Sequence, residues 1–199
     1  MKKLILCLIG FLITITGMAQ VSAKKDSLLR LLQHAKEDTD KVLLYISIGN
    51  VCEMDDKSEA AHYYDMSKKL SEKLNYKLGL IKYYSNYTSI LNEKGEFDSA
   101  LLLNKQSLQL ATIMEDKTIL GKCNANVGNS FNYIGNYDSA LYYYQKAATN
   151  FEAINEGYLL ARVYEMIQLV YQNTGRIDAA LLYGKKALKE LRMAEIFIY

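Results

Sequence analysis

The chain has 199 residues, of which 50% are apolar, and its formal net charge is +2. This is the composition of a soluble globular protein, and the length suggests one domain. A chain so close to neutrality lacks the basic footprint that binds nucleic acid, and it has no general attraction to anionic membranes. We therefore expect no nucleic-acid partner.

The N-terminus has the three parts of a secretory signal peptide. Met1-Lys2-Lys3 is a short basic start, Leu4–Thr16 is an apolar run, and Gly17-Met18-Ala19 is a small-x-small cleavage pattern. The sequence predicts a signal peptide over 1–19, with a second cut site after Ala23. The alternative is an uncleaved anchor, but the run is shorter than the ~20 residues that span a bilayer. Cleavage removes two lysines and leaves a neutral mature protein, periplasmic or secreted.

A short helix is expected over 24–38, with Asp26 as its cap. Its apolar face is formed by Leu28, Leu29, Leu31, Leu32 and Ala35. The polar stretch 37–40 then breaks the pattern. We interpret this helix as a cover over the open end of the array that follows, because the terminal units of a stack need special caps.

One hexapeptide recurs at a spacing of forty residues through the rest of the chain. It reads Gly-Glu-Phe-Asp-Ser-Ala at 95–100, Gly-Asn-Tyr-Asp-Ser-Ala at 135–140 and Gly-Arg-Ile-Asp-Ala-Ala at 175–180, with a weaker copy at 55–60. Self-similarity at such a period is typical of stacked repeats. No Gly/Ser-rich linker interrupts 41–199, so we expect no domain boundary there.

The third copy shows what each repeat forms. Apolar and small residues in 120–134 recur at intervals of three and four, which predicts a helix with one buried stripe. Gly135 follows that stripe and suits the left-handed conformation that ends a helix. Asp138 then lies in the first turn of a second helix, where its charge suits the helix dipole. Each copy is therefore predicted to be two antiparallel helices joined by a tight turn.

These residues resemble the tetratricopeptide repeat (TPR) family at its small and aromatic signature positions. The third copy carries the resemblance best, at Val127-Gly128, Phe131, Gly135, Tyr137, Ala140, Tyr144 and Ala147. It implies an all-α, right-handed α-solenoid of four repeats, at 41–80, 81–120, 121–160 and 161–199, after the N-terminal helix. The period of 40 exceeds the family's 34, and the family's proline is missing. The first copy fits best if its turn, after Ile48-Gly49, is one residue shorter.

Nothing in the sequence points to catalysis, a metal or a cofactor. His34 and His62 have no Cys or His at ligand spacing. Cys52 and Cys123 fall two layers apart, too far for a disulfide, and are expected to be small core residues. No nucleophile elbow, phosphate loop or zinc-protease motif occurs. We expect a non-enzymatic protein.

Polar residues also recur at the repeat period, on the first helix of each pair. The TPR resemblance places these helices on a concave face that binds extended peptides. Amides offer a donor and an acceptor together, which suits a peptide backbone, and the basic column suits a carboxylate. The predicted peptide-binding ladder, against the alternative of an ordinary solvated face, comprises Lys82, Asn86, Ser89, Asn92, Lys122, Asn126, Asn129, Asn132, Arg162 and Gln172.

The leading hypothesis is an extracytoplasmic scaffold that binds a protein or peptide. The chain also resembles the input regions of bacterial membrane-bound histidine kinases and helix-turn-helix regulators, so the alternative is the sensor region of a signalling protein, truncated or stand-alone. The stretch after Met193 is apolar where a stack should end in a polar cap. It fits a chain that continues, a homodimer or partner interface, or an end that folds back.

Overall fold

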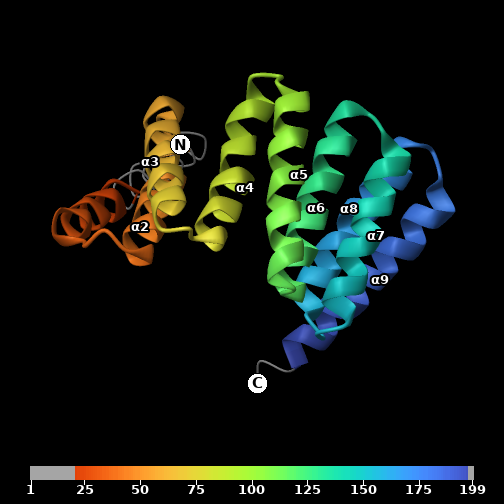
Figure 1. Cartoon of the computed structure of the whole chain (residues 1–199). Coiled ribbons are helices and arrows are strands. Elements are labelled where there is room, and N and C mark those ends of the chain that lie inside the picture. Colours follow the sequence, from red (N-terminus) through yellow and green to blue (C-terminus); the bar gives the residue numbers. More distant parts are fainter. Residues whose placement is uncertain (1–20, 197–199) are drawn as a thin grey trace, which may run out of the picture. The chain divides into compact units, whose positions relative to one another are not determined.

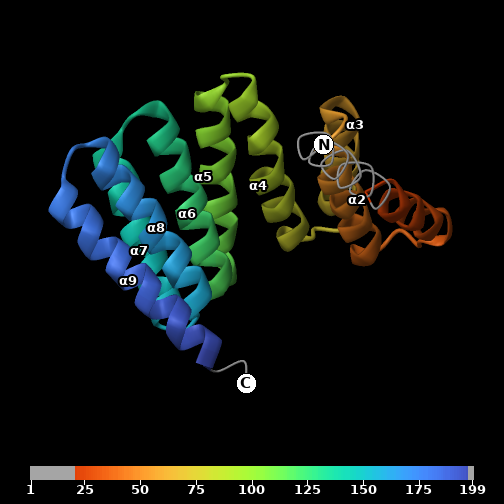
Figure 2. The same cartoon turned by 180° about the vertical axis from the view of Figure 1, so that it is seen from behind.

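The computed structural model describes residues 21–196, and side chains as far as Ala194. Helices and short turns make up this part of the chain, and it contains no strand. The first helix spans 21–34 (Figures 1 and 2). It is followed by α2 (Thr39–Cys52), α3 (Lys57–Lys73), α4 (Lys77–Glu93), α5 (Phe97–Met114), α6 (Lys117–Ile134), α7 (Tyr137–Glu152), α8 (Gly157–Asn173) and α9 (Ile177–Ile196). The all-α prediction is confirmed; the predicted signal peptide lies outside the described residues.

The chain divides into two compact units within α4, one ending at Tyr83 and one beginning at Tyr84. The sequence did not predict this division. In the first unit α2 packs on α3. In the second, each helix from α5 to α9 packs on the next, so that successive helices run antiparallel (Figure 1). The four predicted repeat boundaries remain a prediction.

Helix ends are where the repeating hexapeptide places them. Gly95, Gly135 and Gly175 have φ of 75°, 82° and 71°, the left-handed conformation that glycine adopts without steric cost. Asp98, Asp138 and Asp178 occupy the first turns of α5, α7 and α9. Asx side chains cap other helices. For example, the Asp116 carboxylate accepts from the backbone N–H of Ile119 at 2.9 Å. The predicted hairpin turns are confirmed.

The first helix differs from the prediction in its bounds. It runs over 21–34, so Asp26 lies inside it and is not its cap, and the predicted part 35–38 is not helical. Of the predicted apolar face, Leu31 is exposed, whereas Leu32 packs against the buried residues of α2 and α3. Lys25 forms an ion pair with Glu59 of α3. Within the first unit the helix therefore covers α2 and α3, as a capping helix should.

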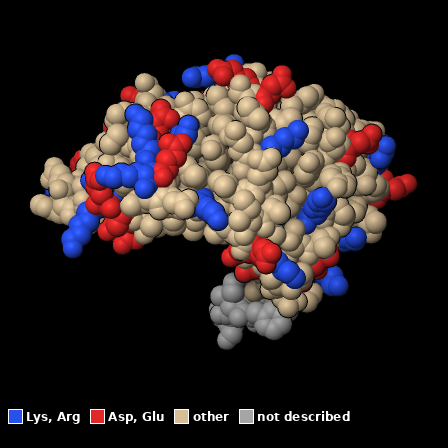
Figure 3. Space-filling view, viewed as in Figure 1, with Lys and Arg blue, Asp and Glu red and all other residues tan. Residues whose placement is uncertain are grey.

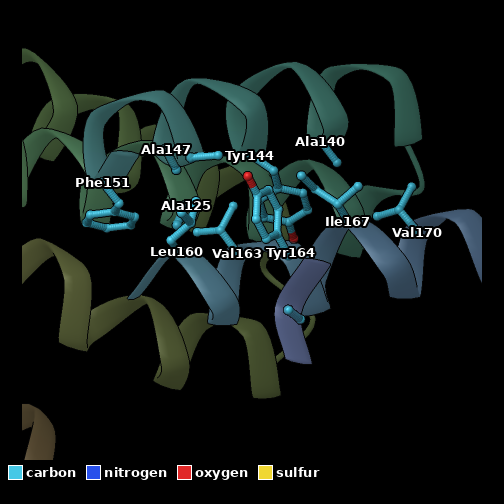
Figure 4. Close-up of a cluster of buried hydrophobic side chains, with 12 residues drawn as sticks. Ala125, Ala140, Tyr144, Ala147, Phe151, Leu160, Val163, Tyr164, Ile167 and Val170 are labelled. Atoms are coloured by element: carbon cyan, nitrogen blue, oxygen red, sulfur yellow. The ribbon is translucent and has the colours of Figure 1, made fainter. Parts of the chain in front are cut away.

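The largest core of the second unit lies mainly between α7 and α8, with contributions from α6 and α9. Tyr144 and Tyr164 lie side by side at its centre, with Phe151 towards one end and Val170 towards the other (Figure 4). Leu160, in the first turn of α8, is also buried in this cluster. The alanines of the four hexapeptide copies, Ala60, Ala100, Ala140 and Ala180, are all buried, and Ala140 belongs to this cluster.

The close approach of α6 to α7 depends on two glycines. A methyl group at Gly128 would lie 2.6 Å from a ring carbon of Tyr144, and one at Gly121 would lie 2.5 Å from Phe151. Gly49 of α2 meets Tyr64 of α3 in the same way, at 2.4 Å. Gly49 is one residue closer to its tyrosine along the chain than Gly128 is, which supports the shorter first turn.

The cysteines and histidines fit their expected structural places. Cys52 and Cys123 are buried and free, as predicted. His34 and His62 are exposed. No cluster of three metal-ligating side chains occurs among residues 21–194. Over the same described stretch, no helix combines the length and the apolar content that crossing a bilayer requires.

Candidate functional site

The predicted ladder is distributed over α4, α6 and α8. Lys82 precedes the division in α4 and belongs to the first unit, whereas the other members belong to the second. Lys122, Asn126 and Asn129 follow one another at intervals of four and three along α6, so they share one face of that helix. Lys122 is exposed and the two asparagines are half-buried. On α6 the ladder is therefore a row of accessible polar groups.

Asn129 is held by a residue that the sequence analysis did not include in the site. The Tyr144 hydroxyl of α7 donates to Asn129 Oδ1 at 2.7 Å, reaching α6 beside Gly128. Because the amide oxygen is engaged, the two N–H donors of Asn129 remain for a ligand. Tyr144 is buried, and burial raises the pKa of its hydroxyl, which stays a neutral donor.

The same arrangement occurs in the first unit. Asn50 directly follows Gly49, as Asn129 follows Gly128, and the Tyr64 hydroxyl lies 2.7 Å from Asn50 Oδ1. A hydroxyl has one proton, and its shorter contact is with Glu53 Oε2, at 2.6 Å, so this carboxylate is the acceptor. Burial, and then the bond to Glu53, raise the pKa of Tyr64. Asn50 does not lie at a multiple of forty residues from Asn129, because the shorter first turn shifts it by one position, so periodicity alone did not predict it.

Other amides of the ladder differ in how far they are satisfied. The backbone carbonyl of Asn126 accepts from Asn104 Nδ2 of α5 at 3.2 Å, while its side-chain amide has no partner within the described chain. Asn92 Oδ1 and Asn132 Oδ1 are both buried without a partner there. An unsatisfied buried acceptor is costly, so these two positions gain from any donor that reaches them.

The ladder is weakest on α8. Arg162 and Gln172 are exposed, and Arg162 Nε lies 3.9 Å from Glu165 Oε2. The two positions that correspond to Asn126 and Asn129 hold Met166 and Leu169. Met166 packs against the core, and Leu169 is exposed. In α4, Ser89 Oγ donates to the carbonyl of Asn86 in its own helix at 2.8 Å. The amide pair is therefore developed best on α6.

The thiols are unsuited to nucleophilic chemistry. Burial, and then the hydrogen bond to Glu59, raise the pKa of Cys52 to about 11. Burial likewise raises the pKa of Cys123, whose sulfur lies 3.2 Å from Ser107 Oγ. Both thiols therefore stay protonated near neutral pH.

On the face in Figure 3, acidic and basic side chains are interspersed without a broad patch of either sign.

Comparison with known proteins identifies the fold. No family model matches the chain, and no curated protein matches it. Among solved structures, a signal-transduction ATPase with a tetratricopeptide repeat sensor, from Pyrococcus horikoshii, is 22% identical with a TM-score of 0.71; the match covers 85% of this chain and 27% of that one.

The fold is TPR-like. Aspartyl phosphate phosphatase F from Bacillus subtilis is 16% identical (TM-score 0.76, 88% of this chain, 50% of that one). A Rap protein in complex with competence and sporulation factor is 17% identical (TM-score 0.77, 89% and 52%). The chain thus spans about half of these two proteins and about a quarter of the first. At such identities the likeness concerns the fold.

Proposed function

We propose that this protein is a non-enzymatic scaffold that binds an unstructured peptide, or an unstructured segment of a protein. The peptide binds on the first helix of a hairpin, above all on α6. One observation carries the proposal: the same Gly-Asn pair and the same tyrosine hydroxyl recur in two separate units, as Gly49-Asn50 with Tyr64 and Gly128-Asn129 with Tyr144. A packing role alone requires the glycine and the ring. It does not require an amide that the hydroxyl orients.

The physical role of this arrangement is to present hydrogen-bond donors to a peptide backbone. Asn129 has its oxygen engaged, so its N–H groups face an incoming carbonyl. An amide that is already fixed loses little conformational entropy on binding. Asn126, one turn away, adds a second amide with an unengaged oxygen and donors. Lys122 supplies a charge for an acidic side chain or a terminal carboxylate.

Two of the named neighbours support binding as a role of this fold. One is a Rap protein complexed with competence and sporulation factor, and another carries its repeats as a sensor. One neighbour is named a phosphatase. For this chain, the protonated thiols and the lack of a metal-ligand cluster in the described part favour a scaffold.

The binding proposal is tested with the double variant Asn126→Ala/Asn129→Ala against a library of unstructured peptides. We expect at least about tenfold weaker binding of the peptides that the wild type selects. Gln109→Ala, an exposed amide on α5, is the matched control and should leave binding unchanged. Equal affinity of the double variant and the wild type would exclude this face as the site.

Tyr144→Phe tests the orienting role of the hydroxyl separately. The ring and the packing remain, but Asn129 loses its fixed partner. Peptide binding should weaken by a few-fold, about 1 kcal/mol, with the larger part of the change in the binding entropy. If calorimetry finds both the affinity and the entropy unchanged, Tyr144 has only a packing role.

We place this scaffold outside the cytoplasm, on the strength of the predicted signal peptide. N-terminal sequencing of the protein recovered from the periplasm or the medium should begin at Gln20, or at Lys24 if the second site is cut. Recovery of the chain with Met1 intact in the cytoplasm would contradict the placement. The second candidate function, the sensor region of a signalling protein, is favoured by the repeat sensor among the neighbours.

A further inference from the structure

A hollow of about 460 Å³ opens between α5 and α7, over the first half of α6. Leu120 and Asn124 of α6 line it, with Leu108 from α5 and Tyr142 and Lys146 from α7. Asn124 and Asn126 are two positions apart on α6, about 200° around the helix, so they point to opposite sides. The hollow is therefore separate from the predicted ladder, and its size is in the range of ligand-binding pockets.

One position of the repeat carries a short side chain at the hollow. With the first turn one residue shorter, the position of Asn124 holds Tyr45, Tyr84 and Tyr164 at the other repeats. Asn124 folds back onto its own helix, where Nδ2 donates to the Leu120 carbonyl at 2.8 Å. At the other repeats, a tyrosine ring is available to occupy this place.

Tyr164 shows what fits such a place. Its ring is buried, and its hydroxyl donates to Glu152 Oε1 at 2.7 Å. The centroid of the Tyr164 ring lies 5.7 Å from that of Tyr183, and Lys186 Nζ lies 5.5 Å from the Tyr164 centroid. Lys186 is the residue that corresponds to Lys146 forty positions earlier. The α8–α9 hairpin thus holds, in its own structure, a phenol ring under a lysine.

Four of the polar groups around the hollow offer oxygen acceptors. Thr112, Asn124, Thr149 and Asn150 each donate to a carbonyl four residues earlier in their own helix, at 2.8 to 3.0 Å. Their oxygen lone pairs remain for a ligand, beside the apolar surface of Leu108 and Leu120. An apolar ring that carries one hydrogen-bond donor matches this lining.

The one charged group that lines the hollow is Lys146, within the described chain. Its Nζ lies 4.6 Å from the centroid of the Tyr142 ring, which is exposed. A second ring placed beside Tyr142 would meet this cation, as Tyr164 and Tyr183 both meet Lys186. No carboxylate lines the hollow, so a partner with an acidic residue next to the ring complements its charge.

We propose that this hollow is a second binding site, which takes a tyrosine side chain next to an acidic residue of a partner polypeptide. The phenol ring occupies the space that Tyr164 fills in the neighbouring hairpin. Its hydroxyl donates to the threonine and asparagine oxygens, and the flanking carboxylate pairs with Lys146. This site is independent of the first-helix ladder, and either site stands if the other fails.

The test follows backbone amide shifts of the full chain by NMR during titration with two blocked peptides, acetyl-Glu-Tyr-Glu-amide and acetyl-Glu-Ala-Glu-amide. The tyrosyl peptide should give saturable shifts around Leu108, Leu120 and Thr149, with a Kd on the order of 1 mM. The alanyl peptide should bind about tenfold more weakly, because it lacks the ring. Equal binding of the two peptides, no saturation, or shifts confined to the ladder would overturn the proposal.

Two variants locate the site. Asn124→Tyr supplies the missing ring from the chain itself and should abolish tyrosyl peptide binding, whereas Lys189→Gln, at an exposed lysine of α9 outside both sites, should leave it unchanged. Lys146→Gln changes an exposed residue and should weaken binding by a few-fold, so it serves if Asn124→Tyr does not fold. Unchanged affinity in Lys146→Gln together with a folded Asn124→Tyr that still binds would refute the assignment.

Discussion

The α6–α7 and α8–α9 hairpins solve the same packing problem with the large and small residues exchanged. In α6–α7 the first helix contributes Gly128 and the second contributes Tyr144. In α8–α9 the first helix contributes Gln168 and the second contributes Gly184, at the same two positions of the repeat. What is kept is one side chain between the helices and no side chain opposite it, because an interior has room for only one.

This exchange coincides with a difference at the ladder. Where the second helix supplies the tyrosine, its hydroxyl reaches the neighbouring asparagine, as at Asn129 and at Asn50 in the first unit. Where the first helix supplies a glutamine, no such hydroxyl exists, and the next residue is Leu169, which is exposed. Among the α2–α3, α6–α7 and α8–α9 hairpins, the first helix has an asparagine at this position only where the second helix supplies the tyrosine.

The largest effect is expected from transferring one arrangement into the other hairpin. Tyr144→Gly should cost about 3–5 kcal/mol, because it removes a buried ring. Gly128→Gln should cost about 1–3 kcal/mol through overpacking. The double variant copies the α8–α9 pair and should be more stable than the sum predicts, by about 0.5–3 kcal/mol. Urea unfolding followed by circular dichroism measures all three, and strict additivity would show that the two positions do not share one space.

A smaller effect is expected from adding a single methyl group to the α6–α7 hairpin. At Gly128 the new carbon would lie 2.6 Å from the ring of a buried tyrosine, which cannot move aside freely. We expect Gly128→Ala to lower the free energy of unfolding by about 1–3 kcal/mol, despite the higher helix propensity of alanine. A stabilised variant in thermal unfolding would mean that the ring relaxes at no cost.

The buried tyrosine of α6–α7 makes the free energy of unfolding depend on pH. Burial raises the pKa of Tyr144, so the folded protein keeps a proton that the unfolded chain releases near pH 10. This contribution to stability is fully present below about pH 10, and it is lost as the pH rises from there through the folded pKa. Stability should fall by up to about 1.4 kcal/mol per pH unit for each such tyrosine.

Tyr144→Phe isolates the pH-dependent contribution of the Tyr144 hydroxyl to stability. The variant cannot ionise at this position, so its free energy of unfolding should fall less steeply between pH 9 and 11 than that of the wild type. The α8–α9 hairpin has Gly184 at this position, so it has no hydroxyl there to ionise. Parallel curves for the two proteins would contradict the burial of the Tyr144 hydroxyl.

The smallest effect should have the opposite sign. A methyl group at Gly184 would approach only the end of the Gln168 side chain, at 2.9 Å, and that amide can turn away. Alanine in the interior of α9 gains helix propensity, so Gly184→Ala should raise the free energy of unfolding by up to about 1 kcal/mol. A loss similar to that of Gly128→Ala would show that Gln168 is as fixed as Tyr144.

The parts of the fold that local chemistry decides could be predicted from the sequence. A turn glycine and a periodic apolar stripe act within one hairpin, so the end of α6 at Gly135 and the start of α7 shortly after it followed directly. Asp26 failed as a cap because the helix begins before it, in a stretch that carries no start signal. The division within α4 was not predictable, since it reflects packing between helices rather than composition.

The candidate site was only partly predictable. Periodicity located Asn126 and Asn129, but a hydroxyl that reaches across from another helix depends on how closely the two helices pack, which no pattern in one helix reveals. Asn50 was hidden by the shorter turn; the Gly-Asn pair followed by a tyrosine was the available signal. Asn124 is visible as the one short side chain at a position that otherwise holds tyrosine.

The backbone conformation of the three turn glycines determines whether an L- or a D-amino acid is favoured at these positions. Nothing lies within 4 Å of where a side chain would start at Gly135, so only its left-handed backbone excludes ordinary amino acids. A mirror-image residue prefers that conformation. D-alanine introduced at Gly135 by chemical ligation should therefore rigidify the free chain and favour the hairpin, whereas L-alanine should oppose it.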